Sequence, residues 1–448
     1  MAGNGREGEA GRLRDWLARA GRLIPGATFD ELVLPEAVAL IPESGSGSRL
    51  RDVNGGEYID YTLGGGALIL GHAHPDVVAA AADQVRRGSA FAMISPPLLE
   101  LAQVIVETVP CAEQVMFAAT GAEATYIALR LARALTGRAR ILKFAGGYHG
   151  FHDVGILSVT SAGRSTTPTP ESAGVAPHAL DDVLVAQFND IDGTAGLIRQ
   201  HHDALAAIIV EPVQRVVLPR PEFLTMLREE SRRFGITLIF DEIVTGFRFA
   251  YGGAQELYGV TPDLATYGKV LGGGYPLSAI AGSRALLGLA NPRGGPAAIS
   301  GSQHGNAVAA AAGLATLRHL ARPGSFQRLR SLTVLMESAL KQALAAAGIA
   351  GRVVVLGPVW HLLPLATGDG PFPDHASSLP VDPTRARAWI EALSIELTRR
   401  GVLAFPRPLR GYVRGYLSLA HSEDDIRQTG ERMREALEAA TRRVQAAW

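Results

Sequence analysis

Two stretches decide the fold: Thr237-Leu-Ile-Phe-Asp-Glu242 and Tyr267-Gly-Lys-Val-Leu-Gly-Gly-Gly274. The first is an apolar run that ends in two acids, and such short runs are typical of strands buried in a parallel sheet. The second places Lys269 among glycines, 28 residues after Asp241, where no neighbouring Cβ blocks a flat ligand. Open α/β sheets bind ligands at the carboxyl ends of their strands, so Asp241 and Lys269 are the first candidate site residues. A turn-capping aspartate and a solvated loop lysine are the plainer alternatives, and each is about as common.

Strand-like and helix-like segments alternate around these stretches. We expect short buried strands, with the brevity of parallel ones, at 114–117, 140–144, 207–210, 237–240 and 279–281. We expect helices at 98–109, 123–136 and 221–234. This alternation predicts an α/β sheet with helices on both faces.

The pattern changes towards both ends of the chain. Residues 10–24 read as an amphipathic helix, and Asn54-Gly55 marks a hairpin within 49–61. The stretch 161–178 is expected to be a flexible loop, and a long helix at 326–347 leads into a second α/β region from residue 353. These changes predict an N-terminal part of a small domain, a large domain and a C-terminal part of the small domain, at 1–65, 66–320 and 321–448.

The composition excludes several classes of protein. The 448 residues include 43 basic and 43 acidic side chains, so the broad positive field that nucleic-acid binding needs is missing. No apolar run reaches the about 20 residues of a membrane span, and residues 1–22 lack the apolar core of a signal peptide. Cys111 is the single cysteine, which excludes an intrachain disulfide and fits a reducing compartment. We therefore expect a cytoplasmic enzyme with no nucleic-acid or membrane partner.

Lysine is scarce in this sequence. Only Lys143, Lys269 and Lys341 occur, and the other 40 basic residues are arginines, which stay protonated and cannot form a Schiff base. Lys341 lies on the polar side of a predicted helix and is expected to be solvated. Lys143 ends a strand, and we expect nothing around it to desolvate or orient it. Lys269 is therefore the best candidate for amine chemistry.

Two further turns follow predicted strands. Ala118-Ala-Thr-Gly-Ala-Glu123 opens a helix, where free backbone N–H groups and the helix dipole favour a phosphate, although such turns are common. Gly146-Gly-Tyr-His-Gly150 holds an aromatic ring between glycines, which suits ring stacking and ordinary packing equally. A Schiff-base lysine, an aspartate for a pyridinium nitrogen, a phosphate site and a stacking ring are together what pyridoxal 5′-phosphate (PLP) requires.

At these residues the sequence resembles the class III aminotransferases of the fold-type I PLP enzymes, and within them the glutamate-semialdehyde aminomutase group. The resemblance covers roughly residues 20–440 and is most specific at Phe240–Arg248, Gly259–Asp263 and Gly268–Gly274. It implies a large domain around a mixed or parallel sheet and a smaller α/β domain built from both termini.

The resemblance implies roles for the residues that match the family pattern. Lys269 would form the Schiff base with PLP and later move protons, and Asp241 would pair with the pyridine nitrogen. Ile243 would pack against one face of the ring and Tyr148 against the other. His149 belongs to the same cofactor site. These roles imply a small-molecule amino donor and a keto acceptor as the partners in the reaction.

The resemblance also implies how the phosphate is held. Gly121 and Ala122 would give N–H contacts, and Thr120 would compensate for the hydroxyl that the family usually has at position 122. Glu211 would line the cofactor cavity, and a turn carboxylate is nearly as common an explanation. Ser302 would reach the phosphate of the partner subunit, which implies a homodimer with shared active sites.

The substrate site departs from the aminomutase pattern. By ungapped counting, the arginine, tryptophan, asparagine and glutamate of the aminomutase fall at Val33, Gly65, Val216 and Val413. These changes predict a roomier and more apolar pocket, and a substrate carboxylate would need a different clamp. The nearest candidate clamps, each of which could equally serve at the surface, are Arg215, Arg407, Arg410 and Arg414.

We therefore predict a PLP-dependent aminotransferase whose substrate is larger and more apolar than glutamate semialdehyde. The alternatives are a PLP-dependent isomerase, either glutamate-1-semialdehyde 2,1-aminomutase or an amino-acid racemase, and a scaffold without catalysis. The combination of Lys269, Asp241 and Tyr148 argues against the scaffold. His72 and His74 have the spacing of a metal pair, but no third ligand is evident in the sequence, so no metal is expected.

Overall fold

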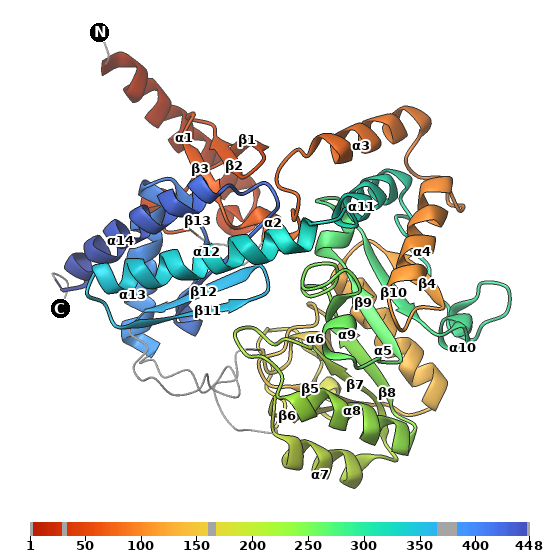
Figure 1. Cartoon of the computed structure of the whole chain (residues 1–448). Coiled ribbons are helices and arrows are strands. Elements are labelled where there is room, and N and C mark those ends of the chain that lie inside the picture. Colours follow the sequence, from red (N-terminus) through yellow and green to blue (C-terminus); the bar gives the residue numbers. More distant parts are fainter. Residues whose placement is uncertain (1–2, 29–33, 160–166, 365–382, 446–448) are drawn as a thin grey trace. The chain divides into compact units, whose positions relative to one another are not determined.

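The computed structural model describes residues 3–28, 34–159, 167–364 and 383–445, and it divides into two compact units (Figure 1). The larger unit spans Pro75–Phe326. The smaller unit combines the residues up to His74 with the described residues from Gln327 onward. Within the described ranges, no helix has the length and apolar character needed to cross a membrane.

A seven-stranded sheet forms the centre of the larger unit, in the order β4-β10-β9-β8-β7-β5-β6. Its strands are β4 (Gln114–Ala118), β5 (Arg140–Phe144), β6 (Val183–Ala186), β7 (Leu205–Val210), β8 (Thr237–Asp241), β9 (Leu264–Tyr267) and β10 (Ser278–Gly282). Strands β6, β5, β7, β8 and β9 pair in parallel. Every residue of β7, β8 and β9 is buried, which explains why their sequences do not alternate between apolar and polar.

The strand expected at 279–281 is present as β10, but the expectation that it is parallel was wrong. β10 runs antiparallel to both β4 and β9. Only residues 268–277 separate β9 from β10, whereas a parallel connection needs a crossover of about a dozen residues or more. The sheet is therefore mixed. Strands β6 and β9, each 4 residues long, were not among the predicted strands.

The larger unit also contains helices, several of which contact the sheet directly (Figure 1). They are α3 (Pro75–Arg87), α4 (Pro96–Thr108), α5 (Gly121–Thr136), α6 (Asp153–Ile156), α7 (Ile191–His201), α8 (Pro221–Phe234), α9 (Gly253–Tyr258), α10 (Arg284–Leu287) and α11 (Ala307–Leu320). Helix α5 contacts β7, β9 and β10, and α8 contacts β8. Ile127 and Leu131 of α5 join Ile141, Ile209 and Ile280 of the sheet in one buried cluster. This packing fixes the N-terminus of α5 beside the strand ends.

The smaller unit contains two four-stranded sheets, in the orders β1-β2-β3-β13 and β11-β12-β15-β14. Their strands are β1 (Pro42–Ser46), β2 (Arg49–Asp52), β3 (Glu57–Asp60), β11 (Gly351–Leu356), β12 (Val359–Pro364), β13 (Val402–Leu403), β14 (Phe405–Arg407) and β15 (Tyr412–Tyr416). The helices are α1 (Gly3–Leu23), α2 (Leu63–Gly66), α12 (Ser325–Ala346), α13 (Pro383–Arg399) and α14 (Glu423–Gln445). Strand β13 pairs in parallel with β3, so this unit is built from both ends of the chain, as predicted.

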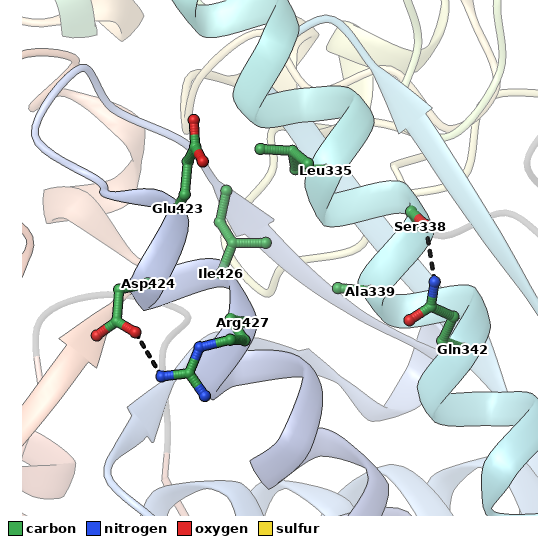
Figure 2. Close-up of a pocket in the computed structure, with 8 residues that line it drawn as sticks. All are labelled: Leu335, Ser338, Ala339, Gln342, Glu423, Asp424, Ile426 and Arg427. Atoms are coloured by element: carbon green, nitrogen blue, oxygen red, sulfur yellow. Dashed lines mark hydrogen bonds and ion pairs between the residues drawn. The ribbon is translucent and has the colours of Figure 1, made fainter.

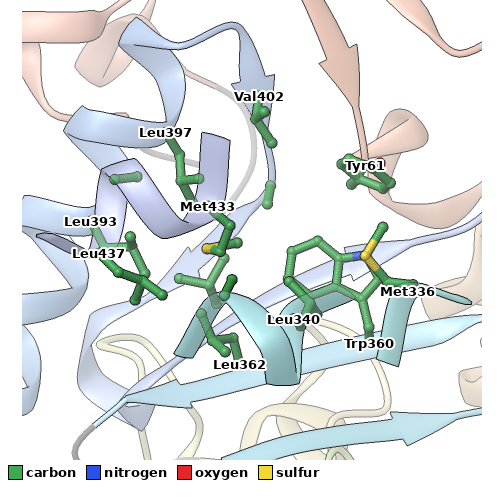
Figure 3. Close-up of a cluster of buried hydrophobic side chains, with 14 of the residues drawn as sticks. Tyr61, Met336, Leu340, Trp360, Leu362, Leu393, Leu397, Val402, Met433 and Leu437 are labelled. Carbon is green, nitrogen blue, oxygen red and sulfur yellow. The ribbon is translucent and has the colours of Figure 1, made fainter. Parts of the chain in front are cut away.

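Buried apolar side chains from both the N-terminal and the C-terminal segments of the smaller unit form its core (Figure 3). Met336 and Leu340 of α12, Trp360 of β12, Leu393 of α13 and Met433 of α14 are all fully buried. Burying an apolar side chain of this size contributes about 1.5–3 kcal/mol. The smaller unit therefore depends on contacts between segments that lie far apart in the sequence.

Candidate active site

Asp241 is held by several donors at the carboxyl end of β8. The residue is only 5% exposed. Its Oδ2 lies 2.7 Å from Nδ1 of His149, and its Oδ1 accepts hydrogen bonds from the N–H of Ile243 at 3.2 Å and from the hydroxyl of Thr266 at 3.4 Å. Burying a carboxylate without partners is costly, and these donors offset that cost. β8 therefore presents a fixed carboxylate at the edge of the sheet.

The loop after β5 carries Tyr148 and His149. Its Gly146 has φ 87°, in the left-handed region that favours glycine. The N–H of Tyr148 donates to Oε1 of Glu211 at 2.8 Å. His149 is 2% exposed, and its Nε2 is buried with no hydrogen-bond partner among the described residues. An orphaned buried nitrogen of this kind is typical of a site that takes a ligand or water.

Arg215, one of the four candidate carboxylate clamps, contacts the same loop. Its Nε donates to the carbonyl of Gly146 at 3.2 Å, and its Nη2 lies 3.9 Å from Oε1 of Glu211. The guanidinium is therefore engaged with the loop and with the end of β7. Of the other three candidates, Arg414 lies over the rings of Phe405 and Tyr416, at 5.3 and 5.1 Å from their centres.

Helix α5 begins with a capping box at Thr120. The Thr120 hydroxyl accepts the N–H of Glu123, and the Glu123 carboxylate accepts the N–H groups of Ala119 and Thr120. The same hydroxyl donates its proton to Oε2 of Glu123 at 3.1 Å, so that proton is used within the cap. As in any helix, the first-turn N–H groups, here those of Gly121 and Ala122, have no acceptor inside the helix. The helix N-terminus therefore suits an anion.

Lys269 lies two residues after the end of β9, with Gly268 between them. It is partly exposed and has φ 45°, a left-handed conformation that costs of order 1 kcal/mol for a residue with a Cβ. Strand β9 is the parallel neighbour of β8, and Asp241 is in register with Thr266. The lysine therefore lies three residues beyond the partner of Asp241, at the same edge of the sheet.

Two glycines face the side chain of Ile243. A Cβ added at Gly121 would lie 3.1 Å from Cδ1 of Ile243, and a Cβ added at Gly268 would also lie 3.1 Å from that atom. The start of α5, the lysine loop and the segment after Asp241 thus converge on one isoleucine. A flat aromatic ring that carries a phosphate fits these features. The glycines leave room for the ring, the start of α5 suits the phosphate, and the Asp241 carboxylate and the unpartnered Nε2 of His149 offer polar contacts.

Some of the predicted site residues do not lie among the groups described above. Ser302 is exposed in the turn before α11, and its reach to a partner subunit stays a prediction. Among the predicted substrate positions, Val33 lies outside the described residues, and Val216 and Val413 are each 1% exposed. Gly65 has φ 73° within α2.

The expectation that nothing around Lys143 desolvates or orients it was wrong. The residue is fully buried in β5, and its ammonium donates to the carbonyls of Val154, Gly155 and Leu157 at 3.4, 3.0 and 2.5 Å. Burial lowers the pKa of Lys143 from 10.5 to about 7, although Glu211 opposes the shift. Sequence gave no sign of this environment, because the carbonyls come from a segment that folds back over β5. By contrast Lys341 is solvated as expected and pairs with Glu337 at 2.6 Å.

Two polar residues near His149 were not predicted. Thr125 of α5 and His152 at the start of α6 contact each other, and Thr125 also contacts the His149 carbonyl. Helical spacing places Thr125 one turn after Gly121, which was the available signal. His72, half of the suspected metal pair, instead contacts Asp60, with Nε2 2.7 Å from Oδ2.

A surface pocket of about 420 Å³ lies between α12 and α14 in the smaller unit (Figure 2). Two pairs of its polar groups bond to each other: Arg427 contacts Asp424 at 2.5 Å, and Gln342 donates to Ser338 at 3.2 Å. None of the predicted site residues lines this pocket. It is therefore separate from the candidate active site.

The fold and the site define a fold-type I enzyme with a mixed seven-stranded sheet that binds PLP. Residues 34–360 match the family model described as aminotransferase class-III, and the chain belongs to that family. A relative from Roseiflexus castenholzii, a glutamate-1-semialdehyde 2,1-aminomutase, is 40% identical over 93% of this chain and 95% of its own length. An omega-transaminase structure from Sphaerobacter thermophilus is 36% identical, with a TM-score of 0.89 over 96% of this chain and 98% of that one. A transaminase structure with PLP bound is 29% identical, with a TM-score of 0.85 over 96% and 97% of the two chains.

Proposed function

We propose that this chain uses PLP to move an amino group, with Lys269 and Asp241 at the centre of the reaction. The supporting observation is that a buried aspartate ends β8 and a lysine lies just after the end of β9, its parallel neighbour. PLP supplies an electron-accepting ring that stabilises negative charge on the substrate carbon. Lys269 would hold the cofactor covalently through Nζ and, once released, carry a proton to and from the substrate carbon.

The remaining residues would orient the cofactor. Asp241 would keep the pyridine nitrogen protonated, because opposite charges in a site poor in water favour the charged pair. Ile243 would cover one ring face and Tyr148 the other. His149 would hold Asp241 in place through the 2.7 Å contact. Glu211 would fix the backbone of Tyr148.

The phosphate would lie at the start of α5. Gly121 and Ala122 would donate their backbone N–H groups to it, and the helix dipole would favour its negative charge. Thr120 would contribute through the capping box that fixes this turn, since its hydroxyl proton already points to Glu123.

We propose isomerisation of glutamate semialdehyde as the leading activity, because curated relatives with 35–40% identity are glutamate-1-semialdehyde 2,1-aminomutases. The sequence-based expectation of an aminotransferase with a bulkier substrate is the second candidate. Gly65 supports it at the level of sequence, because a glycine stands where the aminomutase pattern has a tryptophan. The likeness to the omega-transaminase supports it as well.

One experiment separates the two candidates. Purified holoenzyme is given glutamate semialdehyde without a keto acceptor, and the isomer with the amino group moved from C2 to C1 is measured. In parallel, aliphatic and aromatic amines are tested with a keto acid. Isomerisation with a much higher kcat/KM than any transamination supports the aminomutase. Transamination of bulky amines with negligible isomerisation supports the aminotransferase instead.

We also propose that the active enzyme is a homodimer in which Ser302 contacts the phosphate of the partner subunit. An exposed apolar stretch in the larger unit suits a second copy of the chain, since Met93 and Ile94 are each 77% exposed and Leu99 is 62% exposed. Light scattering of the wild type should give the dimer mass. Ile94→Asp should shift the equilibrium towards monomer, and a monomeric wild type would contradict this proposal.

A further inference from the structure

The hydrogen bonds around His152 define which of its ring nitrogens carries the proton. Its Nδ1 accepts the N–H of Gly155 at 3.1 Å, which caps the short helix α6. Burial lowers the pKa of His152 to about 4, so the ring is neutral near pH 7. A neutral ring that accepts at Nδ1 carries its proton on Nε2. Nε2 lies 3.1 Å from the hydroxyl of Thr125 and therefore donates to it.

The Thr125 hydroxyl is left with one proton of its own to donate. Its closest acceptor is the carbonyl of His149 at 2.5 Å, while the carbonyls of Gly121 and Ala122 are each 3.1 Å away. Thr125 is 1% exposed, so water cannot replace this donor. The hydroxyl thus joins the first turn of α5 to the loop that carries His149.

The chain of hydrogen bonds ends at Asp241. It runs from the N–H of Gly155 through the ring of His152 and the hydroxyl of Thr125 to the backbone of His149. The ring of His149 then contacts Oδ2 of Asp241. Lys143 anchors the far end, since its ammonium holds the carbonyl of Gly155. One continuous network therefore links a buried ammonium to the carboxylate at the end of β8.

We propose that Thr125 and His152 are positioning residues that hold His149, and through it the Asp241 carboxylate, against the ring nitrogen of PLP. This inference rests on the proposed function of Asp241. Thr125 also fixes the spacing between the phosphate end and the ring end of the cofactor, because its hydroxyl contacts the turn of Gly121 and Ala122 as well as His149. Such fixed spacing is what precise orientation of a cofactor requires.

The test compares Thr125→Val, which removes the hydroxyl at nearly constant shape, with Thr125→Ser, which retains it. Thr136→Val is the matched control, because Thr136 bonds the carbonyl of Ala132 in the same helix and contacts none of the site residues. Three quantities are measured for each protein: the dissociation constant of PLP, the pH midpoint of the cofactor absorbance band, and the melting temperature of the protein without PLP.

Thr125→Val should weaken PLP binding about tenfold, the order expected when a buried carbonyl loses its donor, and should shift the pH midpoint. Thr125→Ser should restore both quantities to within about twofold of the wild type. Thr136→Val should change only the melting temperature. Unchanged PLP binding and an unchanged midpoint in Thr125→Val, with a lower melting temperature, would overturn the proposal and leave a structural role only.

Two further results keep the test decisive. If Thr125→Val does not fold, His152→Leu replaces it, because His152 is only partly buried. His152→Leu should shift the absorbance midpoint in the same direction, and a wild-type midpoint in that variant would overturn the proposal. A wild-type protein that takes up no PLP would instead overturn the proposed function itself.

Discussion

The ammonium of Lys143 donates to the backbone carbonyl of Gly155 at 3.0 Å, deep within the larger unit. Two more carbonyls, of Val154 and Leu157, accept from the same nitrogen. A buried amine therefore holds the segment of Val154, Gly155 and Leu157 and, through it, the loop of Tyr148 and His149. Lys143, whose pKa is lowered to about 7, thus has a structural environment, whereas Lys269 is the proposed reacting lysine.

Lys143 should make the stability of the holoenzyme depend on pH. Its pKa is about 7 in the folded chain and 10.5 ordinarily, so between these values the unfolded state binds more protons. Stability should therefore rise from pH 7 towards pH 10, and the contribution is lost as the pH falls back through 7. The free energy of unfolding in urea, measured at several pH values, should rise less steeply in Lys143→Met. Lys341→Met should keep the wild-type slope, and parallel profiles for wild type and Lys143→Met would contradict this prediction.

Lys269→Ala should abolish turnover and the covalent link to PLP. Borohydride reduction of the wild type should remove the yellow absorbance and leave a cofactor adduct on the peptide that contains Lys269. Mass spectrometry of the digest locates the adduct. Circular dichroism should show that Lys269→Ala remains folded, because the residue is partly exposed. An adduct on Lys143 or Lys341 would refute the assignment.

Asp241→Asn should lower kcat by about 10²-fold or more, the order expected for a key electrostatic group. The amide removes the charge that would keep the pyridine nitrogen protonated. It also weakens the contact with His149. Steady-state kinetics and the pH midpoint of the cofactor absorbance should change together. Near-normal values of both would mean that another group holds the nitrogen.

Thr120→Ala should destabilise the protein by about 1 kcal/mol, the usual cost of losing an N-cap side chain. The capping box with Glu123 would be broken, so the turn that presents Gly121 and Ala122 would loosen. PLP binding should therefore weaken along with the free energy of unfolding. Thr120→Ser retains the cap and serves as the control. If Thr120→Ala loses stability but binds PLP as tightly as the wild type, the cap does not support phosphate binding and the prediction is contradicted.

Much of the larger unit was predictable because its signals are local. The short apolar runs predicted β5, β7 and β8, and the glycines around Lys269 marked the position of the lysine loop. The direction of β10 was not predictable from its own residues, since an isolated apolar run looks the same in either orientation. The antiparallel direction of β10 follows from the short connection, residues 268–277, between β9 and β10.

The sequence alone identified the family, predicted the roles of Lys269 and Asp241, and located α5 to within two residues of its start at Gly121, because strand ends, glycines and caps are properties of neighbouring residues. Only the tertiary structure decided what surrounds each side chain. Burial and three carbonyl acceptors made Lys143 a structural amine with a lowered pKa, and the fold brought Thr125, His152 and His149 into one network with Asp241. Burial and hydrogen-bond partners come from segments far apart in the chain, so no local pattern encodes them.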